Sequence, residues 1–172
     1  MPRSISPMLE RLRYIVLAVT TLAILLLVNS QIVIKERILS EGDTLLLRLA
    51  PRDPRSLLQG DYMALRYAMA DEVAQAANAA GIEDGRIVVV VEPTGKADYV
   101  GLYQGETLER NQHLLRFRKR GDSVRLASDA YFFQEGEWQT YRNAQYGELR
   151  VDASGDAVLA GLRDSAFNRL GE

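Results

Sequence analysis

Residue types that carry catalysis are sparse in this sequence, and few of them are spaced to act together. The chain has 172 residues with a single histidine and no cysteine, which excludes thiolate catalysis and a disulfide scaffold. Ser56 lies in a Pro- and Arg-rich segment, but a Ser–Lys hydrolase needs a lysine beside its serine in an apolar site. The three lysines, Lys35, Lys96 and Lys119, each lie near a predicted turn or at the end of an apolar run. We therefore predict no catalytic residue here.

The remaining titratable candidates favour structural roles. Glu135 and Glu137 could form a carboxylate pair for sugar hydrolysis, but they flank Gly136 and fit a turn equally well. His113 lies on a predicted strand with Leu115 and Phe117, where a lone histidine is more often packed or exposed than a base. One histidine without cysteine also leaves too few ligands for a zinc or copper site. We expect no metal and no cofactor, and a small membrane-proximal hydrolase with an unrecognised site remains the alternative.

The charge balance speaks against nucleic-acid binding. Lys and Arg total 21 against 23 Asp and Glu, a formal net charge of -2, whereas nucleic-acid binders carry a basic excess. One predicted hairpin is nevertheless basic, with Arg116, Arg118, Lys119, Arg120 and Arg125. A solvated edge strand explains this cluster best, and contact with anionic lipid headgroups is the alternative.

The N-terminal part of the chain predicts a membrane anchor. No charged residue occurs from Tyr14 to Ile34, a run of 21 residues that would span about 32 Å as a helix. A signal peptide cleaved after Ser30 is the alternative, because Val28-Asn29-Ser30 resembles a cleavage site. The apolar run continues past that point to Ile34, which favours a retained anchor.

The flanking charges predict the orientation of this anchor. Arg3, Arg11 and Arg13 precede the span, whereas Lys35 and Arg37 follow it among acidic residues. We expect residues 1–13 to form a cytoplasmic tail, residues 14–34 to cross the lipid bilayer, and residues 35–172 to form one domain outside.

The pattern after the anchor predicts an α+β domain of mostly antiparallel strands with one or two short helices. In residues 61–69 the odd positions are apolar, which is typical of a half-buried strand. Residues 70–80 are rich in alanine and end before Gly81, which favours a helix. The other expected strands are 43–49, 86–92, 98–103, 112–118, 123–127, 131–134, 148–152 and 157–162, and 137–145 is a possible short helix.

One segment carries a family resemblance. Gly60-Asp61-Tyr62-Met63-Ala64-Leu65-Arg66-Tyr67 fits the pattern GDYxxLxY and resembles the GDYXXLXY family of bacterial membrane-anchored proteins. The segments that start at Pro51, Tyr131 and Tyr146 are also similar to that family. The resemblance implies an inner-membrane protein of a bacterium and no established enzymatic activity. It also hints at a multi-span membrane protein as partner.

The motif itself predicts a structural role. Gly60 permits a tight turn before a strand, and Asp61 can accept hydrogen bonds from the preceding loop or pair with Arg52 or Arg55. Leu65 and Tyr67 share the apolar face, whereas Tyr62 lies on the opposite one. We assign structural roles to Asp53, Arg55, Gly60, Asp61, Tyr62, Leu65 and Tyr67.

A later stretch is the candidate contact surface. Six aromatic residues fall within the 16 residues from Tyr131 to Tyr146, mostly as expected core. We predict that Tyr131, Trp138, Tyr141 and Tyr146 contact a partner, with Trp138 contributing most. The sequence therefore favours an accessory or interaction module.

Overall fold

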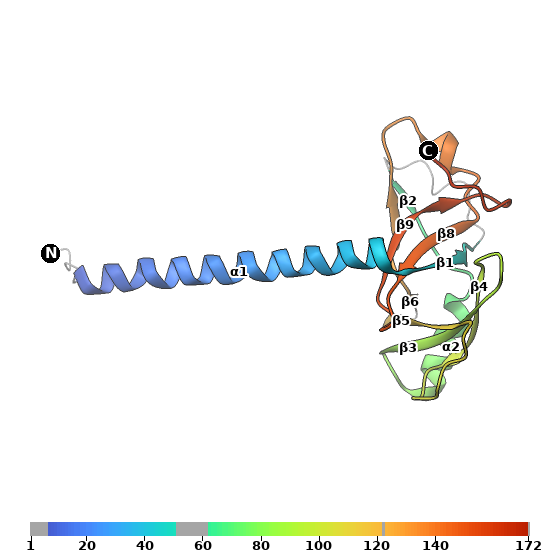
Figure 1. The fold of residues 1–172 in the computed structure, drawn as a ribbon, viewed down its shortest axis with the longest axis horizontal. Helices are drawn as coiled ribbons and strands as arrows, with labels where there is room; N and C mark the ends of the chain where they lie inside the picture. Colours follow the sequence, from blue (N-terminus) through green and yellow to red (C-terminus); the bar gives the residue numbers. More distant parts are fainter. Residues whose placement is uncertain (1–6, 51–61, 122, 172) are drawn as a thin grey trace. The chain divides into compact units, whose positions relative to one another are not determined.

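The computed structural model describes residues 7–50, 62–121 and 123–171, and the chain divides into two units, Met1–Arg37 and Ile38–Glu172. Figure 1 shows the elements along the chain. Their bounds are α1 Pro7–Glu41, β1 Asp43–Arg48, β2 Tyr62–Ala64, α2 Ala70–Ala80, β3 Asp84–Val91, β4 Ala97–Leu102, β5 Gln112–Arg120, β6 Ser123–Arg125, β7 Ala130–Phe132, α3 Trp138–Tyr141, β8 Tyr146–Val151 and β9 Ala157–Arg163. The predicted α+β class with an N-terminal apolar helix is confirmed.

Helix α1 is long and apolar enough to span a membrane, in its stretch Arg11–Glu41. Its apolar side chains are largely exposed, with 63% exposure for both Leu17 and Leu27. A helix satisfies its own backbone hydrogen bonds, which allows such a surface to face lipid. The helix ends at Glu41, and the Gly42 amide donates to the Ile38 carbonyl at 3.0 Å.

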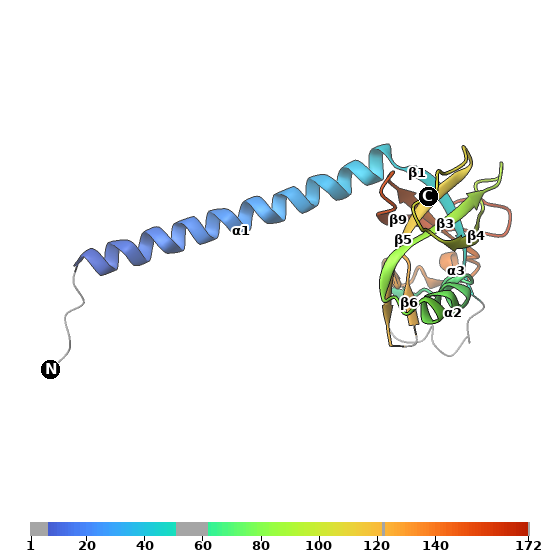
Figure 2. The ribbon, with the colours of Figure 1, turned by 90° about the horizontal axis from the view of Figure 1, so that it is seen from below.

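A four-stranded antiparallel sheet in the order β4-β3-β5-β6 forms one half of the domain. Its hairpins β3–β4 and β5–β6 join strands that the sequence predicts at 86–92 and 98–103 and at 112–118 and 123–127. Helix α2 packs on this sheet through Val73, Ala74 and Ala77, and contacts β4 and β6 (Figure 2). It ends at Gly81, whose φ of 68° is the left-handed conformation that glycine adopts readily.

The second sheet has the order β1-β8-β9 and supplies the other side of the core. Its hairpin β8–β9 joins the strands that the sequence predicts at 148–152 and 157–162. Leu45 and Leu47 of β1 and Leu149 of β8 pack with Ile87 and Phe117 of the four-stranded sheet, all fully buried. The Leu46 amide donates to the Gly95 carbonyl at 2.9 Å, which joins β1 to the β3–β4 turn.

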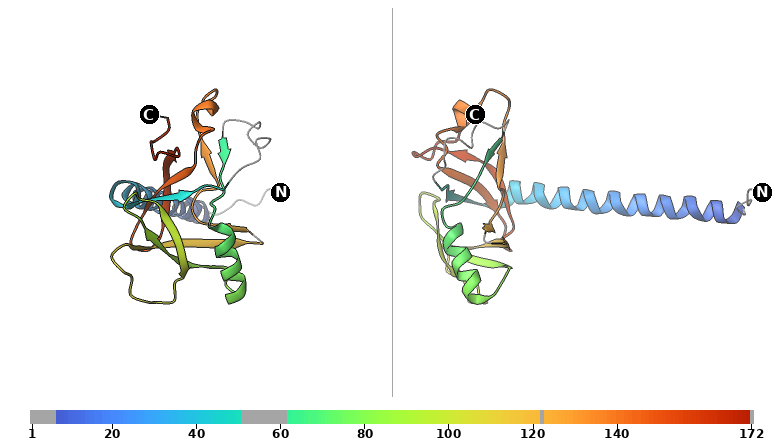
Figure 3. Two further views of the ribbon diagram at one scale, coloured as in Figure 1. Left: turned by 90° about the vertical axis from the view of Figure 1, so that its right-hand side faces the viewer. Right: turned by 180° about the vertical axis from the view of Figure 1, so that it is seen from behind.

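A two-stranded ribbon of β2 and β7 completes the domain, near α3 (Figure 3). Three elements of this region are shorter in the structure than the sequence predicts. The strand expected at 61–69 has regular pairing only over β2, that expected at 131–134 ends at Phe132, and the helix expected at 137–145 is only α3. Beyond β2 the chain leaves β7 and pairs with the end of β1, where the Ala68 amide donates to the Arg48 carbonyl.

The alternation of buried and exposed side chains predicted for 61–69 is present, although the pairing strand changes from β7 to β1. Met63, Leu65, Tyr67 and Met69 are all buried, whereas Tyr62 is exposed. Met63 and Leu65 pack in a small cluster with Tyr141 and Leu162, and Tyr67 and Met69 pack in the main core. The motif segment therefore links the two apolar clusters of the domain.

Candidate functional site

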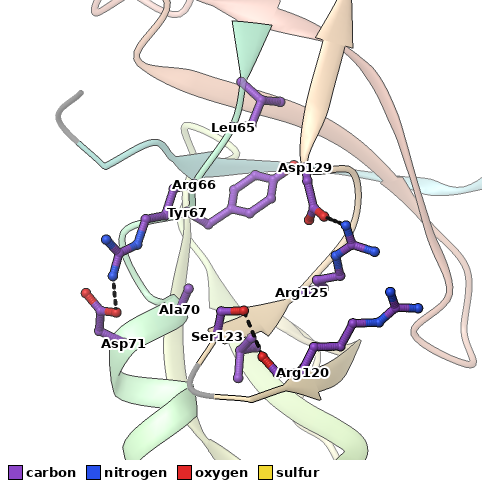
Figure 4. Close-up of a pocket in the computed structure, with 10 residues that line it drawn as sticks. Leu65, Arg66, Tyr67, Ala70, Asp71, Arg120, Ser123, Arg125 and Asp129 are labelled. Carbon is purple, nitrogen blue, oxygen red and sulfur yellow. Dashed lines mark hydrogen bonds and ion pairs between the residues drawn. The ribbon is translucent and has the colours of Figure 1, made fainter. Parts of the chain in front are cut away.

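The motif segment forms one wall of a surface cavity of about 450 Å³, which we name the motif cavity. The segment before α2, the first turn of α2 and the β5–β6 hairpin surround it (Figure 4). Its lining residues are Leu65, Arg66, Tyr67, Ala70, Asp71, Arg120, Ser123, Val124, Arg125 and Asp129. Leu65 and Tyr67, two of the positions that define the motif, thus belong to this cavity.

Tyr67 is the structural centre of the cavity wall. Its side chain is buried, and its hydroxyl donates to the Ser128 carbonyl at 3.2 Å. Burial, and secondarily the charge of Asp129, raise the pKa of Tyr67, so the hydroxyl stays protonated and can donate at neutral pH. A Cβ at Gly147 would lie 3.1 Å from ring carbon Cε1 of Tyr67, so the glycine of β8 leaves room for this ring.

The charged side chains of the cavity form two ion pairs. Arg66 Nη2 lies 2.5 Å from Asp71 Oδ1, and Arg125 pairs with Asp129. Arg120 is the third arginine, and no other residue in the described ranges pairs with its guanidinium, whereas its carbonyl accepts the Ser123 hydroxyl at 3.0 Å. Among the described residues that line the cavity, three guanidiniums thus accompany two carboxylates, a surplus of positive charge.

The cavity offers no pair of a nucleophile and a base. None of its lining residues is His or Lys, and the Ser123 hydroxyl is occupied by a backbone carbonyl. His113 lies outside the cavity, with Nδ1 at 3.4 Å from Asp43 Oδ2. Glu137 accepts the Gln134 amide at 3.3 Å in a turn, as the turn interpretation of this acid predicts. Within residues 7–50, 62–121 and 123–171, no group of three His, Cys, Asp or Glu side chains could hold a metal ion.

Part of the predicted motif site lies outside the described residues. Asp53, Arg55, Gly60 and Asp61, with Arg52 and Ser56, fall in this part of the chain. The expected contacts of Asp61 with the preceding loop therefore stay a prediction.

The described end of the motif exposes an aromatic pair. Tyr62 and Phe132 face each other across β2 and β7, with ring centroids 5.7 Å apart. Tyr62 is 43% exposed and Phe132 is 75% exposed. We call these two residues the aromatic pair. Phe132 was not among the predicted contact residues, although strand alternation places it opposite Tyr131 and Phe133, which pack inward.

The four predicted contact residues differ in exposure. Trp138 is 46% exposed, and the Arg142 guanidinium lies 5.9 Å from its ring centroid. Tyr131 and Tyr146 are half-buried, and Tyr146 packs against Phe167 at 4.9 Å. Tyr141 is buried beneath Phe133 and Tyr131, so it supports this surface from inside. Trp138 is thus the predicted contact residue with the most accessible large ring.

The fold and the cavity define an α+β domain that follows a helix able to span a membrane. The family model described as GDYXXLXY protein matches residues 24–162, which is most of the chain. The chain therefore belongs to the GDYXXLXY family. No curated protein and no solved structure matches it.

Proposed function

We propose that this is a single-pass protein of a bacterial inner membrane whose outer domain binds a multi-span membrane partner. The observation that carries this proposal is the aromatic pair. Phe132 exposes 75% of its surface on a folded domain, and it lies against a second exposed ring, Tyr62. Exposed aromatic residues that are held in place supply large contact area at interfaces.

The anchor supports a partner in the same membrane. A tethered domain meets a membrane neighbour at a raised effective concentration, so a modest contact is sufficient. Trp138 extends the candidate surface beyond the aromatic pair, because it is 46% exposed on α3. The absence of a nucleophile–base pair among the cavity-lining residues gives the hydrolase alternative no support.

The proposed topology has a direct test. Alkaline phosphatase, which is active only outside the cytoplasm, should be active when fused after residue 172 of the full chain. The reason is that the arginines precede the uncharged run and favour the inner side. The same reporter fused at residue 13 should be inactive. The opposite pattern, or a mature protein that begins at Gln31, would contradict a retained anchor.

The proposed surface is tested by capture from bacterial membranes solubilised in mild detergent. Phe132→Ser should reduce recovery of a multi-span partner at least tenfold, because loss of a central aromatic residue of an interface costs about 2 kcal/mol and a tenfold change in affinity corresponds to about 1.4 kcal/mol. Because Phe132 is mostly exposed, the free energy of unfolding of the variant should lie within about 0.5 kcal/mol of that of the wild type. Recovery is measured by quantitative mass spectrometry.

Val100 offers a matched control for this experiment. It is 54% exposed on β4 and lies outside the aromatic pair. Val100→Ser therefore removes exposed apolar surface elsewhere on the domain and should leave recovery unchanged. Equal recovery with both variants and the wild type would show that the aromatic pair is not the contact surface.

A further inference from the structure

We propose that the motif cavity binds a phosphate ester with a small apolar group, a role independent of the aromatic pair. The inference rests on three arginines, Arg66, Arg120 and Arg125, that line one hollow with an apolar wall. These arginines come from two separate parts of the chain, the motif segment and the β5–β6 hairpin. Figure 4 shows them on opposite sides of the Tyr67 ring.

The ion pairs position two of the guanidiniums and leave donors for a ligand. An arginine has five N–H donors. Asp71 accepts from Nη2 of Arg66, and Asp129 pairs with Nη2 of Arg125. The remaining N–H groups of both side chains stay available, since both are about half exposed or more, at 63% and 48%.

Arg120 supplies the charge that these pairs do not neutralise. No residue in the described ranges forms an ion pair with it, and it lies on the same face of β5 as Arg118. Arg118 pairs in register with Arg125 of β6, which adds a further positive charge at the rim. Farther along β5, Arg116 is neutralised by Asp84 and Asp156, at 3.3 and 3.5 Å. Among residues 112–121 and 123–125, the charge without an ion pair is therefore concentrated at the cavity end of the hairpin.

The excess of positive charge at the cavity favours an anionic ligand, and the geometry of the guanidinium groups favours phosphate. Arginine forks bind phosphate and carboxylate oxygens in a bidentate manner. A phosphate offers more oxygens to such donors than a carboxylate, which has only two.

The size and the apolar wall indicate more than inorganic phosphate. A cavity of about 450 Å³ is within the range of small-molecule sites. Leu65, Tyr67 and Val124 provide apolar surface beside the charged groups. The ligand is therefore a phosphate that carries a short apolar group, from a soluble metabolite or from a phospholipid headgroup.

The test uses the full chain in an uncharged detergent without phosphate groups. Phenyl phosphate is titrated by calorimetry, with benzoate as the matched carboxylate. In a parallel arm, retention of phosphatidylglycerol is measured by native mass spectrometry. We expect saturable binding in at least one arm, and phenyl phosphate should bind more tightly than benzoate. The positive arm identifies the soluble or the lipid source.

The matched variants are Arg120→Gln and Arg110→Gln. Arg110 is exposed and does not line the cavity, so it controls for the loss of one positive charge. Arg120→Gln should weaken binding at least tenfold, and Arg110→Gln should leave it unchanged. No saturable binding in either arm, tighter binding of benzoate, or equal loss in both variants would overturn the proposal. None of these results bears on partner capture through Phe132.

Discussion

Glu148→Ala should destabilise the domain by about 2–4 kcal/mol, the largest loss that we expect from removing one polar side chain. Glu148 is the buried charged residue of the described chain, 6% exposed in the middle of β8. Its Oε2 accepts from Nε of Arg163 at 2.8 Å and lies 3.8 Å from Nε of Arg169. Removal of one partner of a fully buried pair costs about 3–5 kcal/mol. The two arginines keep partial access to water, which lowers the expected loss.

The same acid fixes the C-terminal segment on β9. Arg163 also donates to the Phe167 carbonyl at 2.6 Å, and Arg169 donates to the Ala160 carbonyl at 2.8 Å. Without the carboxylate, both arginines lose their common acceptor. Urea unfolding of the detergent-solubilised full chain, followed by Trp138 fluorescence, gives the free energy of unfolding.

Two variants separate this effect from a general loss of charge. Glu148→Gln keeps the shape and an acceptor oxygen, so it should cost less than alanine. Arg66→Ala breaks an ion pair of 2.5 Å between side chains that are 63% and 68% exposed, and should cost about 0–1 kcal/mol. If Glu148→Ala costs no more than Arg66→Ala, the buried network does not stabilise the domain.

Tyr67→Ala should cost about 3–5 kcal/mol, as expected for truncation of a buried aromatic side chain. The ring is only 4% exposed and fills the space left by Gly147. It packs in the main core with residues from both larger sheets. Its loss would leave a hollow beneath the motif cavity that the surrounding strands cannot close.

Tyr67→Phe isolates the hydroxyl from the ring. This variant removes only the hydrogen bond to the Ser128 carbonyl, and should cost about 0.5–1.5 kcal/mol. Thermal unfolding of the two variants and the wild type measures the contribution of the ring and that of the hydroxyl to stability. Equal stability of Tyr67→Ala and Tyr67→Phe would contradict a packing role for this motif position.

Much of the fold could be predicted from sequence because its signals are local. The uncharged run to Ile34, the alanine-rich α2 before Gly81 and the polar turns of the hairpins each specify one element. The pairing of the strand expected at 61–69 is harder to predict, because apolar alternation indicates which side chains are buried and not which strand pairs with it. Tyr67 meets Leu49 in an isolated bridge, a contact that depends on the course of the whole chain.

The candidate site was less accessible to sequence reasoning. Arg66 and Arg120 are 54 residues apart in the numbering, and only the fold places them on one cavity. The basic hairpin is visible in the sequence as a cluster, but the neutralisation of Arg116 by Asp84 and Asp156 is not. The large side chain of Trp138 makes it the best contact residue by sequence. In the structure, Phe132 is more exposed than Trp138, because its side chain points outward from β7.

The most direct test of the proposed contact is photo-crosslinking in intact membranes. A photoreactive amino acid replaces Phe132 in the full chain, and in a separate sample it replaces Val100. Adducts are identified by mass spectrometry. We expect an adduct with a multi-span membrane protein from position 132 and none from position 100. No adduct from position 132, or the same adduct from both positions, would contradict it.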